Sequence, residues 1–189
     1  MRTFIAIDLN DEAKAALIRL QSQLKAADAD IKWVEAENIH LTLKFLGEIA
    51  NQQVDLVKEV LNNTAVQFKP YEITLAGIGA FPKLDYPKVV WVGIRKGNDD
   101  TKGIANKIDD ELMKLGFEKE DRKFSAHLTL GRLRGPKNID KLKSLLKTLN
   151  FAPQSKILVN YINLYRSTLT PQGPIYTSLY KATLRQENF

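Results

Sequence analysis

The tetrapeptide His-Leu-Thr-Leu occurs twice in this chain, at residues 40–43 and again at 127–130, and the sequence contains two histidines in all. By chance alone, a given histidine would be followed by Leu-Thr-Leu on the order of one time in a thousand. Imidazole exchanges protons readily near neutral pH, and a threonine hydroxyl donates hydrogen bonds. The repetition therefore indicates that two imidazole–hydroxyl pairs carry the chemistry of this protein.

The spacing within the tetrapeptide favours a β-strand. Side chains alternate between the two faces of a strand, so His40 and Thr42 point one way while Leu41 and Leu43 point the other. A helix would separate the imidazole from the hydroxyl. We expect each copy to pack its leucines on a core and to present its histidine beside its threonine.

Two such pairs suit the cleavage of a phosphodiester, and this chemistry requires no metal. In an in-line displacement the nucleophile enters on one side of phosphorus while the leaving oxygen departs on the other, and both ends need proton transfer. Two imidazoles with an ordinary pKa of about 6.5 can act as one base and one acid if they flank the phosphate. The threonine hydroxyls can donate hydrogen bonds to the non-bridging oxygens and stabilise the charge that gathers there.

Composition narrows the alternatives. The chain has 189 residues, of which 44% are hydrophobic, enough for a substantial core. The absence of cysteine from the sequence excludes disulfides, thiolate metal sites, iron–sulfur clusters and a cysteine nucleophile. Two histidines also argue against a transition-metal centre, whereas an oxygen-ligated Mg²⁺ site stays open. A net charge of +6 favours anionic partners such as nucleic acid or phosphate ligands.

The sequence also indicates a compartment. A chain without cysteine is typical of a reducing environment, and the apolar run at residues 3–7 is too short for a signal peptide or a membrane span. We therefore expect a cytoplasmic protein that does not enter a membrane.

Apolar periodicity and capping residues predict four helices and a larger number of strands. The expected helices cover residues 11–27, 54–61, 99–115 and 139–149, and Gly116 is placed to end the third. Two prolines make residues 81–87 a connection without regular helix. The expected strands cover residues 3–9, 31–34, 39–46, 71–80, 89–95, 125–133, 156–165 and 175–184.

These elements predict an α+β fold, because strands and helices do not alternate steadily enough for a doubly wound parallel sheet. The sequence offers no Ser/Gly-rich linker between independent domains. We expect a duplicated βα unit that forms two mainly antiparallel sheets, which face each other across a central cleft with helices on the outside.

The chain resembles the two-histidine (2H) phosphoesterases, and within them the RNA 2′,3′-cyclic phosphodiesterases, also called 2′-5′ RNA ligases. The doubled His-x-Thr-x motif defines that family, and the likeness covers nearly the whole chain, through residues 1–8, 33–34, 38–48, 87–93 and 167–169. One departure is Ala126, where similar proteins often have proline before the second histidine. It leaves the motif itself intact.

The resemblance implies a single bilobal domain over residues 1–189, with one lobe carrying His40 and the other His127, and with Thr42 and Thr129 beside them as phosphate ligands. It also implies hydrolysis of RNA 2′,3′-cyclic phosphate ends to 2′-phosphomonoesters, with reversible 2′,5′ ligation of tRNA halves as a weaker activity. By that likeness His127 is the base that activates water, and His40 is the proton donor to the departing 3′ oxygen. No cofactor is implied, and we expect a monomer.

The fifth residue after each histidine differs between the two copies, being Phe45 in the first and Arg132 in the second. Phe45 is a candidate for stacking on a base, and Arg132 is a candidate for binding the substrate phosphate. An odd offset, however, puts both on the face opposite the histidines unless the strand twists or bulges. A core position is therefore the favoured alternative for Phe45.

Two other functions remain open from the sequence alone. The same site could act on small cyclic nucleotides or on 2′,5′-linked oligonucleotides. Alternatively, the protein could be a non-catalytic module that grips an RNA end, although such a binder has no need of two titratable groups. Turnover in EDTA separates the enzyme from the binder.

Overall fold

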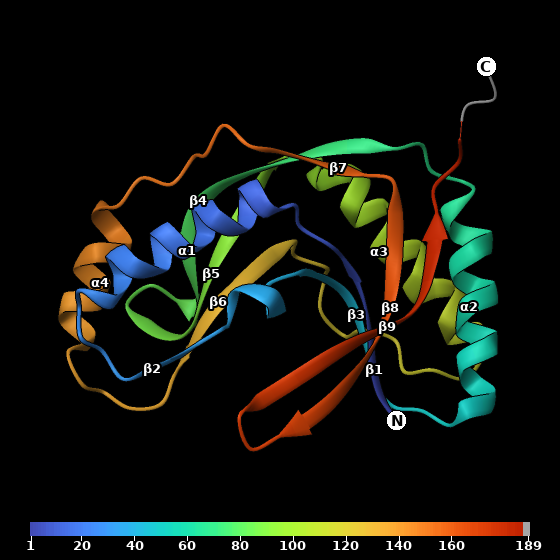
Figure 1. Cartoon of the computed structure of the whole chain (residues 1–189), viewed down its shortest axis with the longest axis horizontal. Helices are drawn as coiled ribbons and strands as arrows, with labels where there is room; N and C mark the ends of the chain where they lie inside the picture. Colours follow the sequence, from blue (N-terminus) through green and yellow to red (C-terminus); the bar gives the residue numbers. More distant parts are fainter. Residues whose placement is uncertain (187–189) are drawn as a thin grey trace.

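The computed structural model describes residues 1–186 and has two antiparallel sheets in an α+β arrangement, as the sequence predicts (Figure 1). The first sheet has the strand order β3-β1-β8-β9, and the second has the order β2-β6-β5-β4-β7. Their bounds are β1 Arg2–Ile7, β2 Ile31–Trp33, β3 Leu41–Glu48, β4 Tyr71–Lys83, β5 Tyr86–Lys96, β6 His127–Leu133, β7 Lys156–Val159, β8 Tyr161–Thr170 and β9 Gly173–Thr183.

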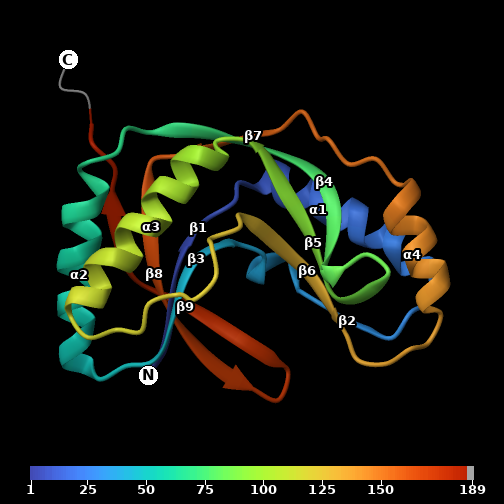
Figure 2. The same cartoon turned by 180° about the vertical axis from the view of Figure 1, so that it is seen from behind.

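Four helices cover the outer faces of these sheets, and a short 3₁₀ turn, η1 (Ala36–Asn38), precedes β3. The helices α2 and α3 lie against the first sheet, whereas α1 and α4 lie against the second (Figures 1 and 2). We call the first sheet with α2 and α3 the first lobe, and the second sheet with α1 and α4 the second lobe. The helices span α1 Asp11–Lys25, α2 Asn51–Ala65, α3 Asn98–Lys114 and α4 Ile139–Thr148.

Local sequence accounts for the helix ends. The side chain of Asn10 accepts a hydrogen bond from the Ala13 amide at 3.0 Å and so caps α1. The C-terminal end of α3 is followed by Gly116, which stops the helix as expected. Its φ is +85°, a conformation that glycine adopts at no steric cost. The buried leucines of α1 recur at helical spacing and fix the face that packs on the second lobe, namely Leu17, Leu20 and Leu24.

Each lobe takes elements from both halves of the chain. Helix α1 follows β1 of the first sheet but crosses to cover the second, where Gln21 donates hydrogen bonds to the carbonyls of Val34 and Leu130. Helix α3 follows β5 of the second sheet and crosses to cover the first, where Asp109 pairs with Lys44 of β3. The buried side chains of both lobes form one continuous core.

Three expected elements need correction. The strand predicted over residues 156–165 is two strands in different sheets, β7 in the second and β8 in the first, separated by Asn160. The strand predicted over residues 39–46 begins at Leu41, because η1 occupies the preceding turn, so His40 lies just ahead of the strand. The connection predicted over residues 81–87 is shorter, because β4 and β5 continue past the pair of Pro82 and Pro87 to the pair of Lys83 and Tyr86. Prolines are tolerated there because β7 pairs with β4 only at residues 71–74 and leaves the far end of β4 as an edge.

Candidate active site

His40 lies at the inner end of a stack of aromatic rings in the first lobe. Its imidazole packs against the ring of Phe4 with the centroids 4.7 Å apart, and the ring of Tyr176 meets it edge-on at 5.2 Å. Burial lowers the pKa of His40 from 6.5 to about 4, while a hydrogen bond to the Asn38 backbone and the charge of Asp8 oppose that shift. The imidazole is therefore neutral at pH 7 before any anion binds.

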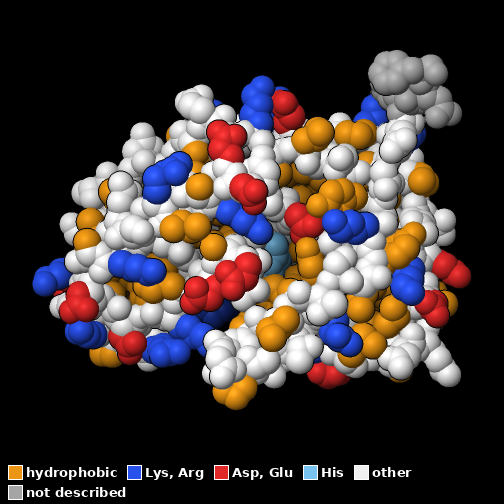
Figure 3. Space-filling view, viewed as in Figure 1, with side chains coloured by type: hydrophobic (Ala, Val, Ile, Leu, Met, Phe, Trp, Pro, Cys, Tyr) orange, Lys and Arg blue, Asp and Glu red, His pale blue; other side chains and the backbone are white. Residues whose placement is uncertain are grey.

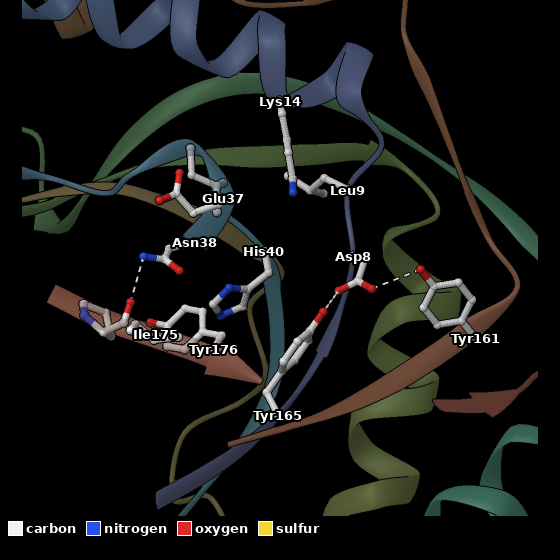
Figure 4. A pocket seen from close by; sticks show the side chains of 12 residues that line it. Asp8, Leu9, Lys14, Glu37, Asn38, His40, Tyr161, Tyr165, Ile175 and Tyr176 are labelled. Atoms are coloured by element: carbon white, nitrogen blue, oxygen red, sulfur yellow. Dashed lines mark hydrogen bonds between the residues drawn. The ribbon is translucent and has the colours of Figure 1, made fainter. Parts of the chain in front are cut away.

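A pocket of about 390 Å³ opens beside this imidazole (Figure 4). Its volume falls within the range of small-molecule sites. The side chain of Lys14 extends from α1 into the pocket. The side-chain amide of Asn38 donates a hydrogen bond to the carbonyl of Pro174 at the start of β9. The hairpin of β8 and β9 therefore forms one wall of the His40 pocket.

His127 occupies the matching position in the second lobe, as the first residue of β6. Its Nδ1 lies 2.7 Å from the carbonyl oxygen of Ser125, just as His40 bonds the backbone two residues upstream. A carbonyl can only accept, so Nδ1 carries the proton and Nε2 is left to exchange one. Burial lowers the pKa of His127 below its ordinary 6.5, the bond to Ser125 opposes this, and the guanidinium of Arg132 lowers it further.

Thr42 and Thr129 each lie two residues after their histidine. Both are half-buried between fully buried leucines, which is the alternation that the sequence predicts. Within residues 1–186, neither hydroxyl forms a hydrogen bond. Both hydroxyls are therefore available to a ligand.

Two β-bulges place Phe45 and Arg132 on the face of the histidines, not on the opposite face that regular alternation predicts. In β3, Thr42 lies opposite Ala6 and Lys44 lies opposite Ile5, so two steps along β3 correspond to one step along β1. Phe45 consequently lies opposite Phe4, with their ring centroids 6.1 Å apart, on the face of His40. Its side chain is 60% exposed, so the favoured core position is wrong.

The second lobe repeats this bulge. In β6, Thr129 pairs with Trp91 and Gly131 with Val90, which turns Arg132 to the same face as Thr129. A Cβ added to Gly131 would approach Ile31 of β2 to 2.6 Å, so the close approach of β2 requires glycine at the bulge. The bulges bring both fifth residues to the side of the histidines.

Polar groups from the crossing helices hold both bulges in place. At the first bulge, the buried ammonium of Lys44 lies 2.5 Å from Asp109 of α3 and 2.8 Å from the carbonyl of Glu118. At the second, Gln21 of α1 donates to the Leu130 carbonyl at 3.0 Å. Sequence reasoning missed these groups, although Asp109 interrupts the apolar stripe of α3 and could have marked such a contact.

Strands β3 and β6, which carry Thr42 and Thr129, contact each other. Burial raises the pKa of Tyr176, which touches His40, while the charges of Arg2 and Arg132 act to lower it. Arg132 of the second lobe is thus close to the first-lobe pocket as well as to His127. On the face drawn in Figure 3, a histidine lies at the bottom of a central hollow whose rim carries both acidic and basic side chains.

The described residues offer neither a metal cluster nor a membrane-spanning helix. Over residues 1–186, no three histidine, cysteine or carboxylate side chains gather where they could hold a metal ion. The helices of that same range are all too short or too polar to span a membrane.

Comparisons with known proteins give a consistent result. The model of the family described as LigT-like phosphoesterase matches residues 7–91 and again residues 92–176, so the duplication extends beyond the tetrapeptides. A protein of Methanothermobacter thermautotrophicus named RNA 2′,3′-cyclic phosphodiesterase is 39% identical over 180 residues, covering 95% of this chain and 96% of the relative.

Solved structures agree with this match. The crystal structure of TT0787 from Thermus thermophilus superimposes with a TM-score of 0.84 at 27% identity and covers all of both chains. That of E. coli LigT complexed with 3′-AMP gives a TM-score of 0.78 at 26% identity and covers 98% of each chain.

Proposed function

Because this chain belongs to the LigT-like phosphoesterase family of the two-histidine superfamily, we propose that it hydrolyses RNA 2′,3′-cyclic phosphate ends to 2′-phosphomonoesters. The observation that carries the proposal is the pair of imidazole–hydroxyl sites, one in each lobe, at the strands β3 and β6 that contact each other. The relative from M. thermautotrophicus bears the name of this activity.

In the proposed mechanism His127 is the base and His40 is the acid. Nε2 of His127 removes a proton from water, the water oxygen attacks phosphorus, the bond from phosphorus to the 3′ oxygen breaks, and His40 protonates that oxygen. Arg132 lowers the pKa of His127 and favours the neutral base. Burial lowers the pKa of His40 to about 4, so His40 takes up its proton when the bound phosphate raises that pKa, and the charge of Asp8 acts in the same direction.

The other site residues hold the substrate. Thr42 and Thr129 donate hydrogen bonds to the non-bridging oxygens, and Arg132 binds the phosphate through its guanidinium. The exposed ring of Phe45 stacks on a base of the RNA. Neither a metal nor a cofactor takes part, since the two imidazoles supply both proton transfers.

The wider role follows from the same chemistry. When the 5′ hydroxyl of a second RNA replaces water as the nucleophile, its oxygen attacks phosphorus, the bond to the 3′ oxygen breaks and a 2′,5′ linkage forms, so halves of a cleaved tRNA are included among the substrates. We expect a monomer, because one chain supplies both histidines, and we expect the cytoplasm as its compartment.

The test is incubation of the protein with an oligonucleotide that ends in a 2′,3′-cyclic phosphate, in the presence of EDTA, with identification of the product. We expect a 2′-phosphate, and a loss of about 10²–10⁴-fold in kcat for both His40→Ala and His127→Ala. Asp55→Asn, an exposed change on α2, is the matched control. A 3′-phosphate contradicts the choice of leaving oxygen, and full activity of either histidine variant contradicts the pair mechanism.

The same assay separates the other candidates. Faster turnover of cyclic mononucleotides or of 2′,5′-linked oligonucleotides would reassign the substrate. Dependence on added Mg²⁺ would contradict the metal-free scheme. Tight binding of the cyclic end without any product would make the protein an RNA-end binder.

A further inference from the structure

Asp8 lies at the wall of the His40 pocket, one residue after β1 ends and before α1 begins (Figure 4). Its carboxylate accepts three hydrogen bonds from side chains of β8, the antiparallel neighbour of β1. The donors are the Tyr161 hydroxyl at 3.0 Å, the Asn163 amide at 3.3 Å and the Tyr165 hydroxyl at 2.5 Å. Three donors on one carboxylate hold it in a fixed position.

The donors keep their protons under all ordinary conditions. Burial and the neighbouring Asp8 raise the pKa of Tyr161 to about 12, and burial together with the bond to Asp8 raises the pKa of Tyr165 further above its usual range. Both hydroxyls therefore remain donors throughout the pH range of activity. The carboxylate is anchored whatever the state of His40.

Asp8 is connected to His40 through a stack of three rings. The ring of Tyr165, whose hydroxyl bonds Asp8, packs on Phe4 with centroids 5.3 Å apart and an angle of 20° between the planes. Phe4 packs in turn on His40 at 4.7 Å and 22°. The carboxylate thus anchors the outer end of a stack whose inner end is the imidazole.

Asp8 also acts against the other charges around the imidazole. Lys14 of α1 lines the same pocket, and its charge lowers the pKa of His40, whereas that of Asp8 raises it. Glu37 lines the far wall from η1. Arg132 lies across the cleft, close to Tyr176.

The second lobe has no equivalent arrangement within residues 1–186. There the charged neighbour that shifts the pKa of His127 is the Arg132 cation, and the ring edge-on to the imidazole is Phe81, with centroids 4.9 Å apart. Both imidazoles bond a backbone group two residues upstream, but the charged side chain with the largest effect on the pKa is the Asp8 anion for His40 and the Arg132 cation for His127. This asymmetry distinguishes the surroundings of the two imidazoles.

We propose that Asp8 is a positioning residue for His40, orienting the imidazole through the Tyr165–Phe4 stack and, by its fixed negative charge, helping it to hold the proton that it gives to the leaving oxygen. The assignment of a leaving oxygen rests on the proposed function. The influence of Asp8 on His40 does not, and it is measurable without substrate.

The test follows the two imidazoles by NMR during a pH titration of the full-length protein. Because the chain has two histidines, a His127→Asn variant assigns both signals. In the wild type His40 is about half protonated near pH 4, and in Asp8→Asn we expect it to be mostly neutral at that pH while His127 is unchanged. Each unit by which the pKa falls removes about tenfold of the protonated His40 at neutral pH, so kcat falls in proportion.

Asp55→Asn removes the same charge from the exposed surface of α2 and should leave both titrations in place. Asp8→Glu, which keeps the charge, should recover the titration of His40. An unchanged His40 titration in Asp8→Asn, or equal shifts in Asp8→Asn and Asp55→Asn, would overturn the electrostatic part of the proposal.

Tyr165→Phe tests the stack independently and covers the case in which Asp8→Asn does not fold. This variant keeps every ring and the carboxylate but removes the hydroxyl that joins them. We expect the His40 titration to be retained and kcat to fall several-fold, with KM unchanged. Wild-type kcat in Tyr165→Phe would refute the positioning role. If the protein fails to hydrolyse cyclic phosphates but Asp8→Asn still shifts His40, the proposed function fails and the influence of Asp8 stands.

Discussion

Replacing Lys44 by methionine tests the buried pair that holds the first bulge. The side chains of Lys44 and Asp109 are only 3% and 12% exposed, and the ammonium also bonds the Glu118 carbonyl. Methionine keeps most of the volume but removes the charge. The carboxylate of Asp109 is then left in the core with only the Glu120 amide, at 3.3 and 3.4 Å, as a donor.

The expected loss of stability follows from this geometry. Breaking a buried ion pair by removing one partner costs about 3–5 kcal/mol, because an uncompensated charge remains. A loss of this size corresponds to a fall in Tm of about 6–20 °C for a chain of this length. By contrast, Lys58→Met breaks an exposed pair with Asp55 on α2 and should cost about 0.5 kcal/mol or less.

The assay is reversible urea unfolding at pH 7 of Lys44→Met, Asp109→Leu and the double variant. We expect the double variant to be more stable than Lys44→Met, since it contains no unpaired buried charge. Lys44→Met should also lower kcat, because Lys44 holds the segment between α3 and β6, which ends in the Ser125 carbonyl that orients His127. A loss below about 1 kcal/mol, or strict additivity in the double variant, would refute this reasoning.

Three further predictions concern the site. Burial lowers the pKa of His40 to about 4 and that of His127 below 6.5, so the bell-shaped profile of kcat/KM should be centred below pH 6.5. The kcat profile should lie at higher pH, because bound phosphate favours both imidazolium forms. A kcat/KM optimum above pH 7 contradicts this. Arg132→Ala should reduce kcat/KM about 10–100-fold and raise the pKa of His127, so that the alkaline limb of the profile moves to higher pH. An unchanged profile would separate Arg132 from the site. Phe45→Ala should raise KM for oligonucleotides about 5–100-fold and leave the free energy of unfolding within about 0.5 kcal/mol of the wild-type value. Leu169→Ala is the control, since Leu169 is also exposed. An equal effect of both variants on KM would exclude base stacking.

The sequence predicted the fold class, the helices and the common face of each histidine and threonine, because these depend on local periodicity. Strand alternation places Thr42 beside His40 even though β3 begins two residues later than expected. The same alternation misplaced Phe45, since a bulge depends on the register with β1, which the local pattern does not contain.

Contacts between distant segments were also beyond the sequence pattern. Lys44 and Asp109 are 65 residues apart, and Asp8 and Tyr165 are 157 apart. Each is an ordinary charged or aromatic residue when read alone, and only the tertiary fold brings it to its partner. The repeated histidine was informative because its rarity did not depend on such contacts.

The crossing of α1 and α3 between the lobes makes the molecule a swapped pair of repeats joined in one chain. The boundary between the two family matches, at residues 91 and 92, falls inside β5, and a cut there deprives each half of strands in both sheets. We therefore expect neither half to fold alone and the two lobes to unfold as one cooperative unit. A single repeat could complete its sheets only by pairing its strands with those of a second copy, so a half-length repeat of this fold would have to dimerise.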